Sequence, residues 1–182
     1  MALVGLKNLY YAIMTINAET GAETYATPVK IGNAVSVDIN PSVDTVSLYG
    51  DDMAVATDNS LKEVSITIET TDISLEQLAA LLGHTYDSTN KKLTAKLTDS
   101  APYVALLFES EKHDGGIRCV KLLKGKFSPS QETINTKGES LEYQVPQLQG
   151  TFVANASGEW KIIKDVAKGT STASWYSAVI ES

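Results

Sequence analysis

The sequence predicts a mainly β protein: an antiparallel β-sandwich or partial barrel with one flanking α-helix, a long inter-strand loop and a C-terminal arm. Residues 35–40 and 62–69 alternate strictly between apolar and polar side chains, which is the pattern of half-buried antiparallel strands. One segment, residues 75–82, carries strong helix signals. Six further segments are rich in strand-forming residues: 9–17, 92–98, 103–111, 117–127, 141–154 and 160–166.

The first strand, residues 9–17, is rich in β-branched and aromatic side chains and ends in a polar turn. The strands at 35–40 and 62–69 are expected to belong to one sheet. Their apolar faces consist of Val35, Val37 and Ile39, and of Val64, Ile66 and Ile68. The intervening residues 41–61 are too many for a tight hairpin, so we expect a long loop there.

The helix at 75–82 is predicted from its ends. Ser74 is a good N-cap residue, and Gln77 completes a capping box with it. Gly83 is placed to stop the helix.

The second half of the chain reads as strands joined by turns. Residues 103–108 are apolar on both faces, which predicts a central strand covered on both sides, and residues 113–116 form a glycine-containing hairpin turn. Pro146 cannot donate a backbone hydrogen bond and marks a sheet edge or bulge. We therefore assign residues 1–154 to one β-sandwich domain and residues 155–182 to a C-terminal strand or arm.

The composition limits the classes of partner. The 182 residues include 15 basic and 22 acidic side chains, a net charge of −7, which argues against a general nucleic-acid binder. No apolar run approaches the ~18–20 residues that cross a bilayer, so no membrane partner is expected. The single cysteine, Cys119, cannot form an internal disulfide, so the chain can fold in a reducing compartment such as a bacterial cytoplasm.

No catalytic or metal-binding pattern stands out. His84, His113 and Cys119 lack the spacing of a metal site or of a nucleophile–base pair. We therefore expect no enzyme activity, no catalytic residue, no metal and no cofactor. A basic cluster on the strand at 117–127 is expected to be a surface strand with solvated side chains: Arg118, Lys121, Lys124 and Lys126.

Six features in order along the chain resemble the major tail proteins of siphophages, the phi13-type tail tube family. They cover roughly residues 3–154. They are VGLKNLYYA (4–12), PSVD with LYGDD (41–44 and 48–52), LLGHTYD (81–87), PYVA (102–105), LLKGKFS (122–128) and PQLQGTF (146–152).

This resemblance implies a β-sandwich subunit that forms homohexameric rings, which stack into a hollow tube. By the same resemblance its partners are other copies of itself, a tape measure protein, and tail terminator and distal tail proteins. DNA passes through the tube without specific binding. The expected location is the virion tail, assembled in the host bacterial cytoplasm.

The polar faces of the strands at 35–40 and 62–69 are predicted to line the channel. They carry three carboxylates and no cation, so they repel phosphates and offer DNA no salt bridges. The bland alternative is a face that simply meets bulk solvent. The predicted lumen residues are Ser36, Asp38, Asn40, Glu63, Ser65, Thr67 and Glu69.

Two further segments are expected to contact neighbouring subunits. The acidic, partly apolar loop is predicted to be disordered in a monomer and ordered between subunits, through Asp44, Val46, Leu48, Tyr49, Asp51, Asp52 and Met53. The C-terminal arm is predicted to pack on its own subunit or on a neighbour, with the neighbour favoured, through Trp175, Tyr176, Val179 and Ile180.

Three alternatives remain open at this stage. The tube of a phage-derived bacteriocin or injection machine would use the same kind of subunit. A β-sandwich binding module, for example for carbohydrate, would expose an aromatic platform, for which Trp160, Trp175 and Tyr176 are the candidates. A small enzyme would need a well-formed pocket with convergent polar groups.

Overall fold

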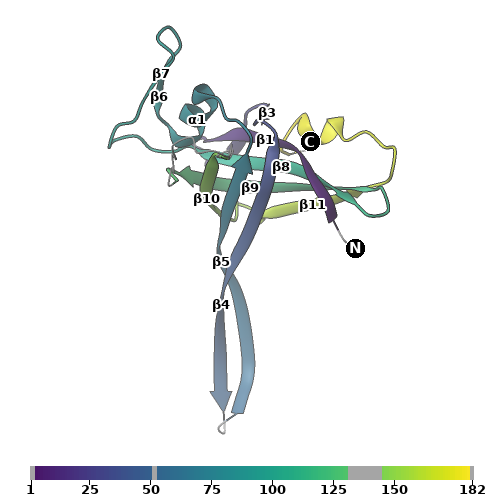
Figure 1. Cartoon of the computed structure of the whole chain (residues 1–182). Coiled ribbons are helices and arrows are strands. Elements are labelled where there is room, and N and C mark those ends of the chain that lie inside the picture. Colours follow the sequence, from purple (N-terminus) through teal and green to yellow (C-terminus); the bar gives the residue numbers. More distant parts are fainter. Residues whose placement is uncertain (1–2, 51–52, 131–144, 181–182) are drawn as a thin grey trace, which may run out of the picture.

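The computed structural model describes residues 3–50, 53–130 and 145–180. Strands dominate it (Figure 1). The strands are β1 (Leu3–Ile16), β2 (Glu23–Tyr25), β3 (Val29–Lys30), β4 (Ala34–Gly50), β5 (Met53–Thr70), β6 (Thr85–Asp87), β7 (Lys92–Thr94), β8 (Tyr103–Lys112), β9 (Ile117–Ser128), β10 (Gln147–Val153) and β11 (Lys161–Val166). The helices are α1 (Leu75–Leu82) and a short 3-10 helix, η1 (Ala173–Tyr176).

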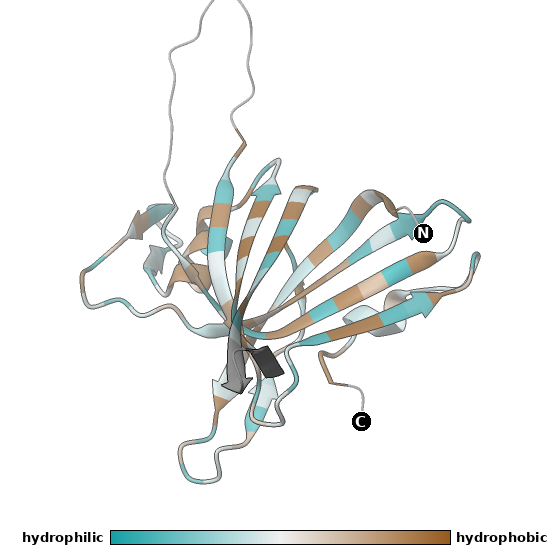
Figure 2. Cartoon of the chain, turned by 90° about the horizontal axis from the view of Figure 1, so that it is seen from below, coloured by the Kyte–Doolittle hydropathy of each residue, from teal (hydrophilic) through white to brown (hydrophobic). Residues whose placement is uncertain are grey.

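Nine strands form one antiparallel sheet in the order β2-β1-β8-β9-β10-β5-β4, with β3 beside β1 and β11 beside β9. The hairpin β6–β7 stands apart from this sheet. Bands of hydrophilic and hydrophobic residues alternate along the strands as they fan around the core (Figure 2). The predicted fold class, mainly β and antiparallel with one α-helix, is confirmed.

Strand β8 lies in the interior of the sheet. It pairs with β1 on one edge and with β9 on the other, and residues 104–109 are all buried. Val104, Leu106 and Phe108 belong to the larger hydrophobic cluster. Ala105 and Leu107 face the opposite side and belong to a second cluster. The prediction of a central strand covered on both faces is therefore confirmed.

Strand β9 divides the sheet into two branches. Its edge opposite β8 pairs with β11 along Ile117–Leu122 and with β10 along Lys124–Ser128. One branch continues through β10 and β5 to β4, and the other ends at β11. The strand at the branch point therefore holds together the two halves of the fold.

Two reciprocal glycine–phenylalanine pairs fix the register of β9 against β10. Gly125 lies opposite Phe152, and Phe127 lies opposite Gly150. A Cβ atom on Gly125 would lie 2.3 Å from the Phe152 ring, so no larger residue fits there. The two rings meet edge to face, with centroids 6.0 Å apart. A one-residue slip would place each ring against a neighbour that has no room for it.

Helix α1 begins and ends where the sequence predicts. The Ser74 hydroxyl accepts a hydrogen bond from the backbone N–H of Gln77 at 3.2 Å, and the side-chain oxygen of Gln77 accepts one from the backbone N–H of Ser74. Gly83 closes the helix with φ 73°. The helix buries Ala79, Leu81 and Leu82 and so covers part of the core.

Three local features differ from the sequence prediction. The strand expected at 92–98 ends at Thr94, and residues 96–99 form a turn. The short strands β2, β3 and β6 are too brief to show a period in the sequence. Val35 was expected on the apolar face but is 48% exposed. The register shifts between Ala34 and Ser36, so Val35 occupies a β-bulge and leaves the alternation.

Candidate functional site

The hairpin β4–β5 is the most extended feature of the molecule. β5 pairs with β10 from Val64 to Glu69, whereas β4 and β5 pair with each other all the way to Gly50 and Met53. Residues 43–50 and 53–61 therefore form a two-stranded ribbon whose strands pair with each other beyond the sheet. This ribbon projects far from the body (Figure 1).

The ribbon corrects the prediction of a long loop. Two register shifts, at Ser42/Val43 and at Leu48/Tyr49, break the period-two pattern, so the sequence does not look like strands there. Pro41 is tolerated because β4 is an edge strand. Asp51 and Asp52 lie outside the described residues. The backbones of Val46, Leu48, Tyr49 and Met53 are paired, and the inter-subunit role of the segment stays a prediction.

All seven predicted lumen residues lie on one face of β4 and β5. Residues directly opposite each other in an antiparallel pair share a face. The register pairs Ser36 with Glu69, Asp38 with Thr67, Asn40 with Ser65, and Ser42 with Glu63. Between them Val64, Ile66 and Ile68 point into the core. The division into a polar and an apolar face is confirmed, and its position in a channel stays a prediction.

This polar face continues onto β10. Gln147, Gln149 and Thr151 lie opposite Glu69, Thr67 and Ser65, and all three are exposed. Polar and apolar residues alternate along 147–152 in the sequence. This alternation is the signal by which the polar face could have been predicted to include a third strand. Two hydrogen bonds join three strands at the Glu69 carboxylate, from the Ser36 hydroxyl at 2.9 Å and from the Gln147 amide at 2.7 Å.

The charge of the face changes across the strands. The acids Asp38, Glu63 and Glu69 lie on β4 and β5, whereas Lys126 on β9 lies opposite Thr151 of β10. The Lys126 ammonium stands 4.5 Å from the centroid of the Tyr103 ring, a cation–π contact. The acidic character thus belongs to the hairpin and fades towards the middle of the sheet.

The C-terminal segment packs on its own subunit, which corrects the preference for a neighbour. Trp175 and Val179 are 5% and 2% exposed, and η1 takes the place of the expected strand. Tyr176 stacks on Tyr10 with ring centroids 4.6 Å apart. Ile180 remains 54% exposed. We call residues 167–180 the C-terminal strap, because they cover the second hydrophobic cluster on the sheet.

Polar groups are buried beneath this strap. The Lys121 ammonium, on a residue 1% exposed, donates to the carbonyl of Ala178 at 2.9 Å and lies 4.0 Å from the Trp175 ring centroid. The Glu109 carboxylate, on a residue 5% exposed, accepts from the Tyr176 hydroxyl at 3.1 Å and from Asn8 at 2.6 Å. Burial, with a contribution from Glu109, raises the pKa of Tyr176 well above its usual range.

The remaining residues that the sequence singled out serve the structure. Cys119 is buried, and burial raises its pKa to about 11, which keeps it an unreactive thiol. The solvated basic strand is wrong in two respects: Lys121 is buried, and Lys124 forms an ion pair with Glu23 at 2.7 Å. The sequence does not predict the ion pair between Lys124 and Glu23, because the two residues are about 100 positions apart along the chain.

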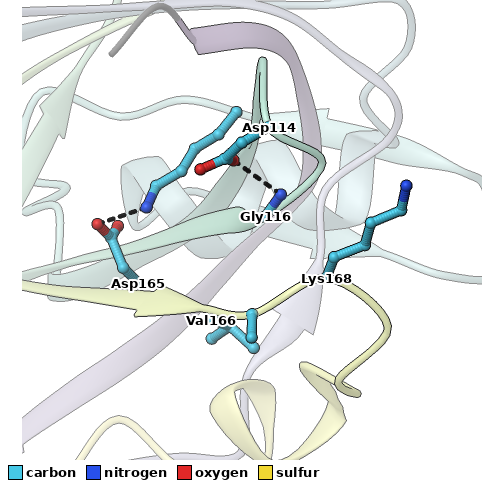
Figure 3. A pocket seen from close by; sticks show the side chains of 7 residues that line it. Asp114, Gly116, Asp165, Val166 and Lys168 are labelled. Atoms are coloured by element: carbon cyan, nitrogen blue, oxygen red, sulfur yellow. Dashed lines mark hydrogen bonds and ion pairs between the residues drawn. The ribbon is translucent and has the colours of Figure 1, made fainter.

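A shallow pocket lies where β8 turns into β9 and β11 ends (Figure 3). Lys112 contacts Asp165 at 2.6 Å, and Asp165 accepts two further bonds from Arg118 at 2.8 and 2.9 Å. These cations hold the pKa of Asp165 far below its usual range. The Gly116 amide donates to Asp114 at 3.0 Å. The charged groups around Asp165 are thus occupied in tying β11 to the sheet.

Neither the aromatic platform nor a metal site is present in the parts of the chain that are described. Trp175 is buried and Trp160 packs against the larger cluster. No three His, Cys, Asp or Glu side chains of those parts are grouped to hold a metal ion.

A scan against protein-family models and a search of curated proteins found no match. No helix among the described residues has the length and hydropathy to span a membrane.

Proposed function

We propose that this protein is the structural subunit of a phage tail tube, which assembles into stacked hexameric rings around a conduit for the genome. The observation that carries the proposal is the self-paired ribbon of β4 and β5. An isolated two-stranded ribbon is marginally stable in water and exposes two open edges. A subunit that keeps such a ribbon gains stability when the ribbon docks on a neighbour.

The rest of the fold suits repeated head-to-tail contacts. A tube needs unlike surfaces to meet, both around each ring and between rings. The sheet has unlike edges: β4 is long, whereas the opposite edge is made of the short strands β2 and β3 beside β1. The family resemblance of residues 3–154 supplies the expectation of hexameric rings.

The polar face of β4, β5 and β10 supports a role as channel wall. It offers carboxylates, hydroxyls and amides and buries its apolar side chains on the opposite face. Carboxylates repel DNA phosphates, and neutral hydroxyls and amides form no ion pairs with them, so DNA can slide past such a wall.

The proposal is tested by shortening the ribbon. Removing residues 46–58 and joining Thr45 to Asn59, which are register partners, through an Asn-Gly turn keeps the pairing of the base. We expect negative-stain micrographs of the full chain at high concentration to show tubes and those of the shortened chain to show none. The melting temperature should stay close to that of the full chain. Normal tubes from the shortened chain, or no assembly by the full chain, would contradict the proposal.

The channel wall is tested by charge reversal. Asp38→Lys with Glu63→Lys changes two side chains of the polar face, while Glu69 is left in place because it joins three strands. We expect intact tubes that release DNA more slowly at low salt and recover as salt rises, since new phosphate contacts are screened. Unchanged release at low salt would place this face outside the channel.

A further inference from the structure

Residues 84–100 form a small lobe beside the end of α1, which we call the basic lobe. It contains the hairpin β6–β7 and the turn at residues 96–99. The tip of the hairpin is fixed by the Asp87 side chain, which accepts bonds from the amides of Thr89 at 2.9 Å and Asn90 at 3.2 Å, and from the Asn90 side chain at 2.7 Å.

The turn at 96–99 is fastened to α1. The Asp99 carboxylate accepts from the Lys96 amide at 2.8 Å and contacts His84 Nδ1 at 2.9 Å, and the His84 and Asp99 side chains are each 12% exposed. The helix end fits closely against this segment, since a Cβ on Gly83 would lie 2.2 Å from the carbonyl oxygen of Ser100. The turn is therefore held in one conformation.

Leu97 stands in this turn, and its exposure is 105%. A single exposed leucine on a mobile loop needs no explanation. Here the backbone on both sides is fastened, so the side chain is held in water. A partner surface that receives this side chain has to order its rotamers but not the backbone that carries it, which lowers the cost in conformational entropy.

The charges of the basic lobe are available to a partner. Lys91, Lys92 and Lys96 are exposed, and none of them forms an ion pair within the described residues. The two acids of the basic lobe, Asp87 and Asp99, are engaged by the hydrogen bonds above, which lower the pKa of each.

The ribbon has the complementary character. By sequence, residues 41–61 contain four aspartates and no basic residue. At the start of the ribbon Asp44 is exposed and Val43 is 50% exposed. The hairpin β6–β7 and the end of the ribbon lie at opposite ends of the molecule (Figure 1). One copy therefore cannot bring its own lobe and ribbon together.

We propose that the basic lobe of one copy is the docking surface for the ribbon of the next copy. The lysines would face the aspartates, and Leu97 would meet Val43, which is half exposed at the start of the ribbon. The contact joins unlike surfaces at opposite ends, so it repeats into an open stack instead of closing as a dimer. The inference rests on the proposed tube, for which it names the surface that receives the ribbon.

Two variants, each blocked at one end, test the contact by itself. The lobe variant carries Lys91→Ser, Lys92→Ser and Leu97→Ser; the ribbon variant carries Val43→Ser, Asp44→Ser and Asp58→Ser. A matched control carries Val29→Ser, Lys30→Ser and Lys168→Ser, which remove one exposed valine and two exposed lysines elsewhere. Circular dichroism establishes that all three remain folded.

Sedimentation velocity at low salt supplies the readout. Each blocked variant alone should stop at the unit formed by lateral contacts, a monomer or a single ring. An equimolar mixture of the two variants should show twice that mass, because the intact ribbon of the lobe variant can dock on the intact basic lobe of the ribbon variant. In a second mixture the ribbon variant also carries the lobe substitutions, so neither protein has an intact basic lobe. The affinity between the two proteins should then be about tenfold lower or weaker still. The control should assemble like the unmodified chain.

The outcomes separate the two proposals. If the lobe variant stacks as well as the control, or the mixture gains no mass, the basic lobe is not the receiving surface. If the mixture pairs but the unmodified chain forms no tubes, the docking contact stands and the tube is wrong. If tubes form and only the ribbon variant is impaired, the ribbon docks elsewhere.

Discussion

The C-terminal strap and the ribbon share one feature of their sequences. Both carry apolar residues within a segment that is too polar or too short to form a hydrophobic core by itself. The structure resolves them in opposite ways. The strap buries Trp175 and Val179 on its own sheet, while the ribbon leaves the sheet and pairs with itself. Apolar residues in such a segment thus indicate that it packs on something. Only the folded structure shows whether that partner is the same subunit or another molecule.

The physical difference lies in what each segment finds beneath it. The strap meets a sheet face that has apolar side chains, such as Leu107 and Leu123, and buried polar groups that need partners. The ribbon extends past the last residues of β10, so no strand of the described part of the chain lies beside it. Stability experiments should therefore separate the two segments clearly.

The largest effect is expected from removing the strap. Truncation after Gly169 exposes the second cluster and deprives Lys121 and Glu109 of the Ala178 carbonyl and the Tyr176 hydroxyl. We expect a melting temperature lower by many degrees, or an unfolded chain. Trp175→Ala, a milder change, should cost about 3–5 kcal/mol of unfolding free energy. A truncated chain as stable as the shortened-ribbon variant would abolish the distinction between the two segments.

A smaller effect isolates one hydrogen bond under the strap. Tyr176→Phe keeps the ring on Tyr10 and removes the hydroxyl that donates to the buried Glu109 carboxylate. We expect a loss of about 1–3 kcal/mol in urea unfolding, because a buried acceptor loses a donor. Tyr10→Phe is the matched control and should change stability by less than about 0.5 kcal/mol. Equal effects of the two substitutions would mean that the ring stacking, and not the hydroxyl, fastens the strap.

The smallest effect is a pH dependence at β11, the strand that leads into the strap. The pKa of Asp165 is depressed by Arg118 and Lys112, so its stabilising contribution is present above the carboxyl's ordinary pKa of about 4 and is lost as pH falls below it. We expect Asp165→Asn to lower the melting temperature at neutral pH and to flatten its decline in acid. The shortened-ribbon variant should follow the unmodified profile, and a parallel profile for Asp165→Asn would contradict this role.

Local patterns predicted the fold class, helix α1 with its caps, and the two-faced strands of the hairpin, because alternation and capping are visible within a few residues. The strap could not be placed, because its partners Tyr10, Glu109 and Lys121 are distant in sequence and their burial depends on the whole sheet. The ribbon was hidden by bulges that interrupt its period. The polar face of β10 is visible in the alternation of residues 147–152.

The hairpin also differs from the rest of the sheet in when it can form. β4 and β5 are consecutive and close at Gly50 and Met53, so their pairing needs only a short loop closure. β1 must wait for β8, since Leu3 pairs with Lys112. Contacts so distant in sequence slow folding. During synthesis the ribbon is therefore expected to exist while the body is still open, and crowded nascent chains risk pairing through it before each has closed its own core.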